Sequence, residues 1–264
     1  MRPLLYAKRY PLYARNVAVR FIAQKRKKLV NKENSSIKIK EILENIVKKL
    51  EEKENYLNRL DAQIGDGDHG RTIVNAFKKA QKALLEKESG GEDEVGSSDK
   101  NTDIGTLLKR MGRTLAFSTG AAAGPLYGTA FIEVGKVMEG KREISLKDWV
   151  KLTRAAEAGI IKRGRGKVGE KTMLDTLHPM VETLKETLAK SEVLKKSSAK
   201  TDLLKEALLR AKEAAQKGME STREMVSKRG RSSRLGERTR GHIDPGAASS
   251  YYIIEAIIKT CLKV

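Results

Sequence analysis

The sequence predicts an all-α fold, a mostly antiparallel helical bundle built as one domain. Apolar residues recur every three or four positions in eight separate stretches, which is the spacing of a single buried helix face. No stretch shows the alternation of apolar and polar residues, bounded by turn residues, that indicates a strand. With 264 residues, of which 39% are hydrophobic, the chain is long enough to bury a substantial core.

The eight helices follow one another with short connections that contain glycine and polar residues. In order, we expect them at about residues 37–57, 71–88, 104–115, 125–139, 145–160, 173–188, 201–227 and 247–262. Pro125 suits a helix start because the first turn needs no amide hydrogen from it. Ser145 and Asp148 have the spacing of a capping box, which predicts the start of the fifth helix.

The positive charge is concentrated near the N-terminus. Residues 1–32 contain ten Lys or Arg and no Asp or Glu, which is half of the formal net charge of +20. This segment has three interpretations: a tail that binds RNA or acidic lipid, an Arg-rich targeting peptide, and a solvated extension. The absence of serine disfavours the targeting peptide. We assign residues 1–35 to a basic extension and residues 36–264 to the folded domain.

Composition excludes several classes of protein. No run of about 18 apolar residues is present, so no membrane-spanning helix is predicted. The single cysteine, Cys261, excludes a disulfide framework and a cysteine-based zinc site. It suits the reducing cytosol, and we expect a cytoplasmic protein. Three histidines are too few for a His-rich metal centre.

The segment Leu60–Gly70 carries the most informative cluster. Asp61, Asp66 and Asp68 lie within eight residues, among glycines that permit tight turns. Carboxylates this close repel one another, and a divalent cation relieves the repulsion. Oxygen ligands favour Mg²⁺ or Ca²⁺, and the EF-hand pattern fails because Phe77 stands where it needs glutamate. Mg²⁺ shared with a phosphate at the start of the next helix is therefore favoured, with a solvated acidic turn as the alternative.

Three other loops have compositions suited to phosphate. Thr119–Gly128 is rich in small residues, Gly164–Thr172 in glycine and cations, and Arg231–Gly246 in arginine. The ordinary alternatives are close helix packing, helix punctuation and a basic surface. The G-x-G-x-x-G pattern at Gly164–Gly169 is not a dinucleotide fingerprint, because a predicted helix and not a strand precedes it.

The order of the four loops predicts that they form one site. They follow the first, third, fifth and seventh helices, and alternate connections of an up-and-down bundle lie at the same end. Carboxylates for a metal, glycines for close approach of phosphate and arginines for charge together indicate a Mg-nucleotide site.

These motifs resemble those of the L subunit of dihydroxyacetone kinases, the nucleotide-binding component, over about residues 36–264. The matching segments are Leu60-Asp61 with Ile64–Gly70, Gly124–Thr129, Glu170–Met173, and Leu235–Arg238 with Gly241–Ala247. The resemblance implies an eight-helix antiparallel up-and-down barrel with the nucleotide at one rim. Three residues depart from the family pattern: Ala121 replaces a glycine, Ala123 replaces a phosphate-binding serine, for which Thr119 is the candidate substitute, and Glu170 replaces an aspartate. The basic extension has no counterpart in the family.

The resemblance also implies the site residues. Two Mg²⁺, bound by Asp61, Asp66 and Asp68, would bridge the phosphates of ADP or ATP, and these carboxylates with Arg231 would be the catalytic residues. Nucleotide contacts are implied for His69, Gly70, Arg71, Thr72, Ala122, Ala123, Gly164, Met173, Arg231, Asp244, Pro245 and Gly246.

The implied activity is that of half an enzyme. The chain would transfer a phosphoryl group to dihydroxyacetone held on a separate K subunit, as a kinase of glycerol metabolism and as part of a homodimer or hetero-oligomer. Either ATP exchanges, or ADP stays bound and a phosphohistidine M subunit rephosphorylates it. Two alternatives stay open: a non-catalytic nucleotide-binding regulator and, less favoured, a basic helical protein that binds nucleic acid.

Overall fold

The computed structural model describes residues 11–86, 103–141, 144–193 and 200–263. These residues form eight α-helices and two 3-10 helices, and they contain no strand, so the predicted all-α class is confirmed. The elements are α2 (Pro11–Ile64), α3 (His69–Glu86), α4 (Ile104–Phe117), α5 (Ala123–Val137), α6 (Leu146–Gly164), α7 (Met173–Val193), α8 (Lys200–Ser221), η2 (Thr222–Glu224), η3 (Arg231–Thr239) and α9 (Pro245–Leu262).

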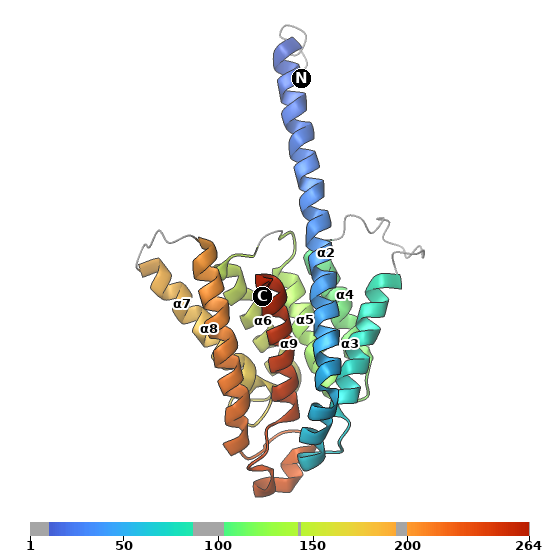
Figure 1. Ribbon diagram of the computed structural model, residues 1–264, viewed down its shortest axis with the longest axis vertical. Helices are drawn as coiled ribbons and strands as arrows, with labels where there is room; N and C mark the ends of the chain where they lie inside the picture. Colours follow the sequence, from blue (N-terminus) through green and yellow to red (C-terminus); the bar gives the residue numbers. More distant parts are fainter. Residues whose placement is uncertain (1–10, 87–102, 142–143, 194–199, 264) are drawn as a thin grey trace.

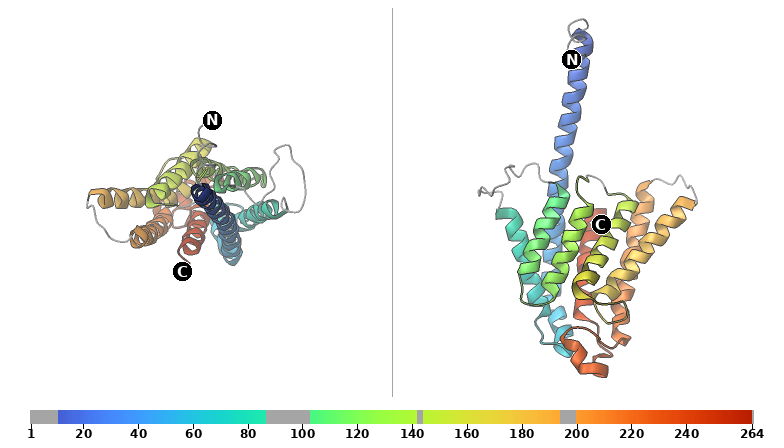
Figure 2. Two further views of the ribbon diagram at one scale, coloured as in Figure 1. Left: turned by 90° about the horizontal axis from the view of Figure 1, so that it is seen from above. Right: turned by 180° about the vertical axis from the view of Figure 1, so that it is seen from behind.

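Successive helices run in opposite directions and pack side by side (Figure 1). α2 also packs against α9, so the helix contacts form a closed ring, as expected for an up-and-down barrel. The helices converge toward the end that carries η3 and spread apart toward the other end (Figure 2). The expected polar connection at 90–102 lies outside the described residues.

The first helix is longer than the predicted 37–57. At its C-terminal end, Leu57, Leu60 and Ile64 continue the apolar stripe and are buried, so the helix extends through Asp61. At its N-terminal end, the backbone is helical from Pro11 and passes residue 35 without a break. The division of the chain at residue 35 therefore stays a prediction.

The interior of the bundle is apolar. One continuous core joins all eight helices, and it borders a partly open pocket of about 160 Å³ that is lined mainly by apolar side chains. Ile39, Met138 and Cys261 are among the residues that line this pocket. Within the described ranges, no helix combines the length and the apolar composition that crossing a membrane requires.

Most of the other helix boundaries also differ from the prediction by a few residues, and two of these differences bear on the site. α5 begins at Ala123 rather than Pro125, which moves the proline into the first turn, where its missing amide hydrogen is still tolerated. α8 ends at Ser221 rather than near residue 227. The chain turns there because the Thr222 hydroxyl accepts a hydrogen bond from the Asp244 amide (3.0 Å), while the Thr222 carbonyl accepts one from Lys171.

The predicted capping box at the start of α6 is confirmed. The Ser145 hydroxyl accepts a hydrogen bond from the Asp148 amide (3.2 Å), and the Asp148 carboxylate accepts one from the Ser145 amide (3.1 Å). Lys141 lies 2.8 Å from the same carboxylate. Burial raises the pKa of Asp148, but the hydrogen bonds from Lys141 and Ser145 outweigh burial and lower the pKa to about 2.

We expect Asp148→Asn to lower the free energy of unfolding at pH 7 by about 1–2 kcal/mol, the size of a lost cap. Because the folded-state pKa lies below the ordinary value of 3.8, this stabilisation is present above about pH 4 and disappears as the pH falls through 2. Urea unfolding of both proteins at pH 7, 4 and 2 measures the difference. A difference of the same size at pH 2 and pH 7 would contradict the assignment.

Candidate functional site

The four loops predicted to share one rim meet at the narrow end of the bundle (Figure 1). Arg231 forms an ion pair with Asp66, which joins the loop after α8 to the loop after α2. Arg229 lies 2.6 Å from Glu170, which joins the same loop to the one after α6. Tyr127 of α5 donates a hydrogen bond to the backbone at the start of α9 (3.3 Å). The alternation of loops along the chain therefore predicted their meeting correctly.

Asp61, Asp66 and Asp68 come together as the sequence predicts. Each can offer one carboxylate oxygen, and these three oxygens lie within 4.8 Å of one another. Asp61 is only 9% exposed in the last turn of α2, Asp68 is partly buried and Asp66 is exposed. In the described part of the chain, no other group of three His, Cys, Asp or Glu residues is close enough to hold a metal ion.

The backbone between α2 and α3 is shaped to hold this cluster. Gly67 has a φ of +79°, a conformation that other residues rarely adopt. A Cβ atom on Gly65 would lie 2.3 Å from Asp61 Oδ1, so any other residue there would displace the Asp61 carboxylate. Asp61 Oδ2 accepts hydrogen bonds from the amides of Asp68 (3.0 Å) and His69 (3.2 Å). These two amides therefore orient Asp61.

The ligand set fits a hard divalent cation. It consists of carboxylate oxygens without sulfur or nitrogen, which is the chemistry that Mg²⁺ prefers. Arg231 supplies a positive charge at Asp66, the most exposed of the three. Negative charge gathered at one point, next to an arginine that can reach it, is suited to bind a metal together with a phosphate.

The N-terminus of α5 is open to an anion. Ala122 is its N-cap residue and forms no side-chain hydrogen bond, so the first amides of the helix, beginning with Ala123, lack a side-chain cap. Thr119, the candidate substitute for a missing serine, donates its hydroxyl hydrogen to the Ala121 carbonyl (3.2 Å). Its hydroxyl hydrogen is therefore used inside the loop.

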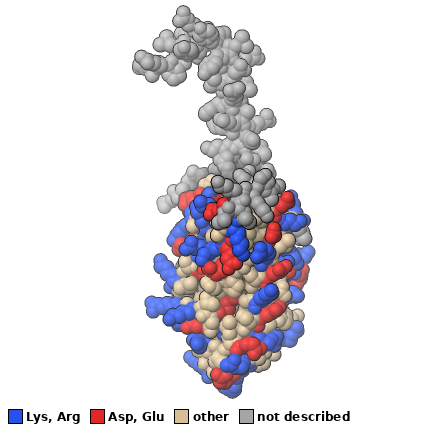
Figure 3. Space-filling model, turned by 90° about the vertical axis from the view of Figure 1, so that its left-hand side faces the viewer, with Lys and Arg blue, Asp and Glu red and all other residues tan. Residues whose placement is uncertain are grey.

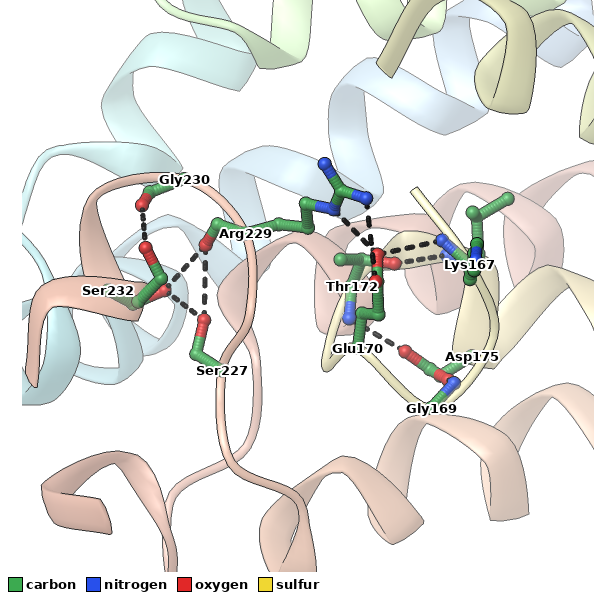
Figure 4. Close-up of polar contacts among 11 residues, drawn as sticks. Lys167, Gly169, Glu170, Thr172, Asp175, Ser227, Arg229, Gly230 and Ser232 are labelled. Atoms are coloured by element: carbon green, nitrogen blue, oxygen red, sulfur yellow. Dashed lines mark hydrogen bonds and ion pairs between the residues drawn. The ribbon is translucent and has the colours of Figure 1, made fainter. Parts of the chain in front are cut away.

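The loop between α6 and α7 is ordered by a second capping interaction. Asp175 accepts hydrogen bonds from the amides of Gly169 (2.5 Å) and Thr172 (2.7 Å) (Figure 4). The predicted contact residue Gly164 is the last residue of α6, and Met173 is the first of α7. Both ends of this loop therefore lie at the rim.

The predicted contact residues 244–246 form the start of α9. Asp244 is the N-cap, and its carboxylate accepts a hydrogen bond from the Ala247 amide (2.7 Å). Burial raises the pKa of Asp244 to about 7, against the opposing effects of this hydrogen bond and of the Lys171 charge. Pro245 and Gly246 follow in the first turn, and a Cβ atom on Gly246 would lie 3.9 Å from Met173 Cε.

The other predicted contacts belong to the first turn of α3. His69 and Gly70 open that helix, and the Arg71 amide donates to Asn58 Oδ1 (3.1 Å). The Thr72 amide donates to the Asp68 carbonyl (2.9 Å). All the predicted site residues thus lie at the same end of the bundle, while their individual roles stay proposals.

A buried polar network behind the aspartates was not predicted from the sequence. His69 Nε2 lies 2.9 Å from the Ser249 hydroxyl, which lies 2.8 Å from the Tyr127 hydroxyl. Burial lowers the pKa of His69 more than Asp61 and Asp68 raise it, so the imidazole is neutral at pH 7. The network connects α3, α5 and α9 directly beneath the site.

Sequence reasoning also missed Asp175 and Arg229, which shape the loops. It treated Lys171 only as one cation of a loop suited to phosphate, whereas the structure buries its ammonium group against the carbonyls of Thr222 and His242. Only Asp175 left a local signal, since Thr172 and Asp175 have the Ser/Thr-x-x-Asp/Glu spacing of a capping box. Lys171 and Arg229 act across long sequence separations, so no local pattern marks them.

Most of the chain is similar to proteins of one known family. Residues 63–259 match the DAK2 domain family. The ADP-binding subunit DhaL of a PEP-dependent dihydroxyacetone kinase from Listeria innocua is 33% identical, over 84% of this chain and 93% of its own length. The corresponding subunit from Escherichia coli is 35% identical, over 76% of this chain and 86% of its own length.

A solved structure shows the same fold. It is the dihydroxyacetone kinase of C. freundii in complex with AMP-PNP and Mg²⁺, with a TM-score of 0.56 and 24% identity. The match covers 83% of this chain but only 33% of that protein. On the sequence matches, the chain belongs to the DAK2 domain family and to the family of the DhaL subunits of dihydroxyacetone kinases.

Proposed function

We propose that this chain is the nucleotide-binding subunit of a dihydroxyacetone kinase. The observation that carries the proposal is the cluster of Asp61, Asp66 and Asp68 at the point where four loops meet. The names of the two DhaL relatives, which describe ADP-binding subunits, support the same ligand. ADP or ATP would lie across the rim, between the aspartates and the start of α9.

The residues at the rim divide the work of phosphoryl transfer. Asp61, Asp66 and Asp68 would hold two Mg²⁺, which when bound neutralise phosphate charge and stabilise the transferring group. Arg231 is placed to add positive charge at the phosphates, and the uncapped amides of α5 are placed to donate hydrogen bonds to a phosphate oxygen. Met173 and Gly246 would contact the rest of the nucleotide.

The acceptor would come from a partner. Dihydroxyacetone would be held on a separate K subunit that meets this rim, so this chain would be active only in a hetero-oligomer. A phosphohistidine M subunit would rephosphorylate bound ADP if the nucleotide does not exchange. The names of the DhaL relatives, which describe ADP-binding subunits of PEP-dependent kinases, favour this relay over ATP exchange.

Mass analysis of nucleotide released from the purified, denatured protein tests the proposal. We expect ADP or ATP from protein purified with Mg²⁺, and little from protein purified with a chelator. Phosphate transfer to dihydroxyacetone with a cognate K subunit then separates a kinase subunit from a non-catalytic regulator. Protein that neither retains nor binds ADP with Mg²⁺ would contradict the proposal.

Where the side chains are described, the α7–α8 side of the molecule gives little support to nucleic-acid binding. On the α7–α8 side of the molecule, Lys and Arg alternate with Asp and Glu and form no continuous basic stripe (Figure 3). Phosphate backbones bind to clustered positive charge, which this face lacks.

A further inference from the structure

We propose that Lys171 is a positioning residue, which fastens the two ends of the segment 222–242 and thereby delivers Arg231 to the aspartate cluster. We call residues 222–242 the arginine segment; it runs from the end of α8 to just before α9. The proposal builds on the function proposed above, because Arg231 matters only if the cluster binds a metal and a nucleotide.

Lys171 joins the two ends of the arginine segment directly. Its side chain is 1% exposed, and its ammonium group donates hydrogen bonds to the carbonyls of Thr222 and His242. These two residues are the first and the last of the segment. Hydrogen bonds from a charged donor are about twice as strong as neutral ones. One buried cation therefore fixes the separation of two points that lie 20 residues apart in the sequence.

A buried ammonium group carries a desolvation penalty, so it contributes little net stability to a fold. Replacing buried charged groups with apolar ones of similar size is often neutral or stabilising. Burial also lowers the pKa of Lys171, while the Asp244 charge acts in the opposite direction. A positioning role explains why a lysine, rather than an apolar residue, occupies this place.

The neighbouring residue, Glu170, fastens the middle of the same segment. Its carboxylate accepts hydrogen bonds from Arg229 Nε (2.6 Å) and from the Lys167 amide (2.8 Å) (Figure 4). Its carbonyl accepts one from the Lys228 amide (3.1 Å). The dipeptide Glu170-Lys171 thus holds both the ends and the middle of the arginine segment.

The short turn from Arg229 to Arg231 links the position of one arginine to that of the other. Ser227 donates a hydrogen bond to the Arg229 carbonyl (3.1 Å), and Ser233 donates one to the Gly230 carbonyl (2.7 Å). Gly230, with a φ of +66°, reverses the chain between the two arginines. The turn is therefore internally bonded, and the position of Arg229 sets where Arg231 meets Asp66.

Lys171→Met tests the proposal, because methionine has a similar length and is readily buried. The arginine segment contains seven Lys or Arg residues, so trypsin reports its opening. We expect initial cleavage within the segment of the apo protein, mapped by mass spectrometry, to become about tenfold faster through loss of two charge-assisted hydrogen bonds. Dissociation of ADP in the presence of Mg²⁺ should accelerate by a similar factor, while the helical content stays unchanged.

Two further variants make the test specific. Glu170→Gln removes the charge of the carboxylate that pairs with Arg229, and it does not disturb the core. It therefore still tests how the arginine segment is held if Lys171→Met does not fold. It too should accelerate cleavage. Glu237→Gln is the matched control, because Glu237 is 78% exposed and pairs with Arg240 within the same segment. It should leave both rates as in the parent protein.

A double-mutant cycle shows whether Lys171 acts through Arg231. If it does, Lys171→Met adds little to the ADP dissociation rate once Arg231→Gln is present, whereas a purely structural effect adds in full. A parental cleavage rate in folded Lys171→Met protein, or full additivity with Arg231→Gln, would overturn the proposal. If Lys171→Met does not fold, a parental cleavage rate in Glu170→Gln would overturn it. Because cleavage is measured without nucleotide, a chain that does not bind ADP refutes the proposed function and still tests the tether.

Discussion

Asp66→Asn should weaken binding of ADP in the presence of Mg²⁺ by about 100-fold or more, since even residues behind a metal ligand contribute 10–100-fold. Asp66 belongs to the three-carboxylate cluster, and it also pairs with Arg231. One substitution therefore removes a candidate metal ligand and the partner of a candidate phosphate ligand. Isothermal titration calorimetry with ADP, with and without Mg²⁺, measures the change.

The same variant should remain folded. Neutralising one of three neighbouring carboxylates removes repulsion between them, and it also removes the exposed ion pair with Arg231. Both effects on the free energy of unfolding are small and opposite in sign, so the metal-free variant should be about as stable as its parent. Asp202→Asn is a suitable control, since Asp202 is an exposed residue in the first turn of α8, at the other end of the bundle. Equal ADP affinity of the Asp66→Asn and Asp202→Asn proteins would refute the metal and nucleotide site.

Gly128→Ala should lower the free energy of unfolding by about 3 kcal/mol, at the upper end of the usual cost of overpacking. α4 and α5 approach each other at paired glycines. A Cβ atom on Gly128 would lie 2.6 Å from the Gly112 carbonyl oxygen, and a Cβ atom on Gly112 would lie 2.6 Å from the Gly128 carbonyl oxygen. Backbone atoms cannot move aside as the end of a side chain can, so the helices must separate.

Gly120→Ala is the matched control for this prediction. Gly120 lies in the same small-residue segment, Thr119–Gly128, just before α5, and no atom lies within 4 Å of a Cβ placed on it. Urea unfolding of the two variants and the parent protein provides the measurement. If Gly128→Ala and Gly120→Ala differ by less than about 0.5 kcal/mol, the range of ordinary surface substitutions, the close packing of α4 on α5 is not a source of stability.

The small-residue segment Thr119–Gly128 shows how a functional and a structural interpretation can both hold. The sequence left phosphate approach and helix packing as alternatives. In the structure, Gly128 serves the packing of α5 on α4, whereas the uncapped start of α5 at Ala122 and Ala123 faces the rim. Composition alone could not separate the two, because small residues suit both purposes.

The sequence by itself determined the helical class, the aspartate cluster and the end of the bundle at which the four loops meet. These features depend on local periodicity, on close sequence spacing and on the alternation of an up-and-down topology, all of which can be read along the chain. The capping box at Ser145 belongs to the same group, since both of its partners lie within one turn.

Only the tertiary structure decided where α8 ends, which residues hold the arginine segment and how closely α4 approaches α5. Lys171 reaches carbonyls 51 and 71 residues away, and Arg229 reaches a carboxylate 59 residues away. Every residue has a backbone carbonyl, so the sequence does not indicate which carbonyl will accept a hydrogen bond from a distant side chain. Such contacts form only when packing has already brought distant segments together.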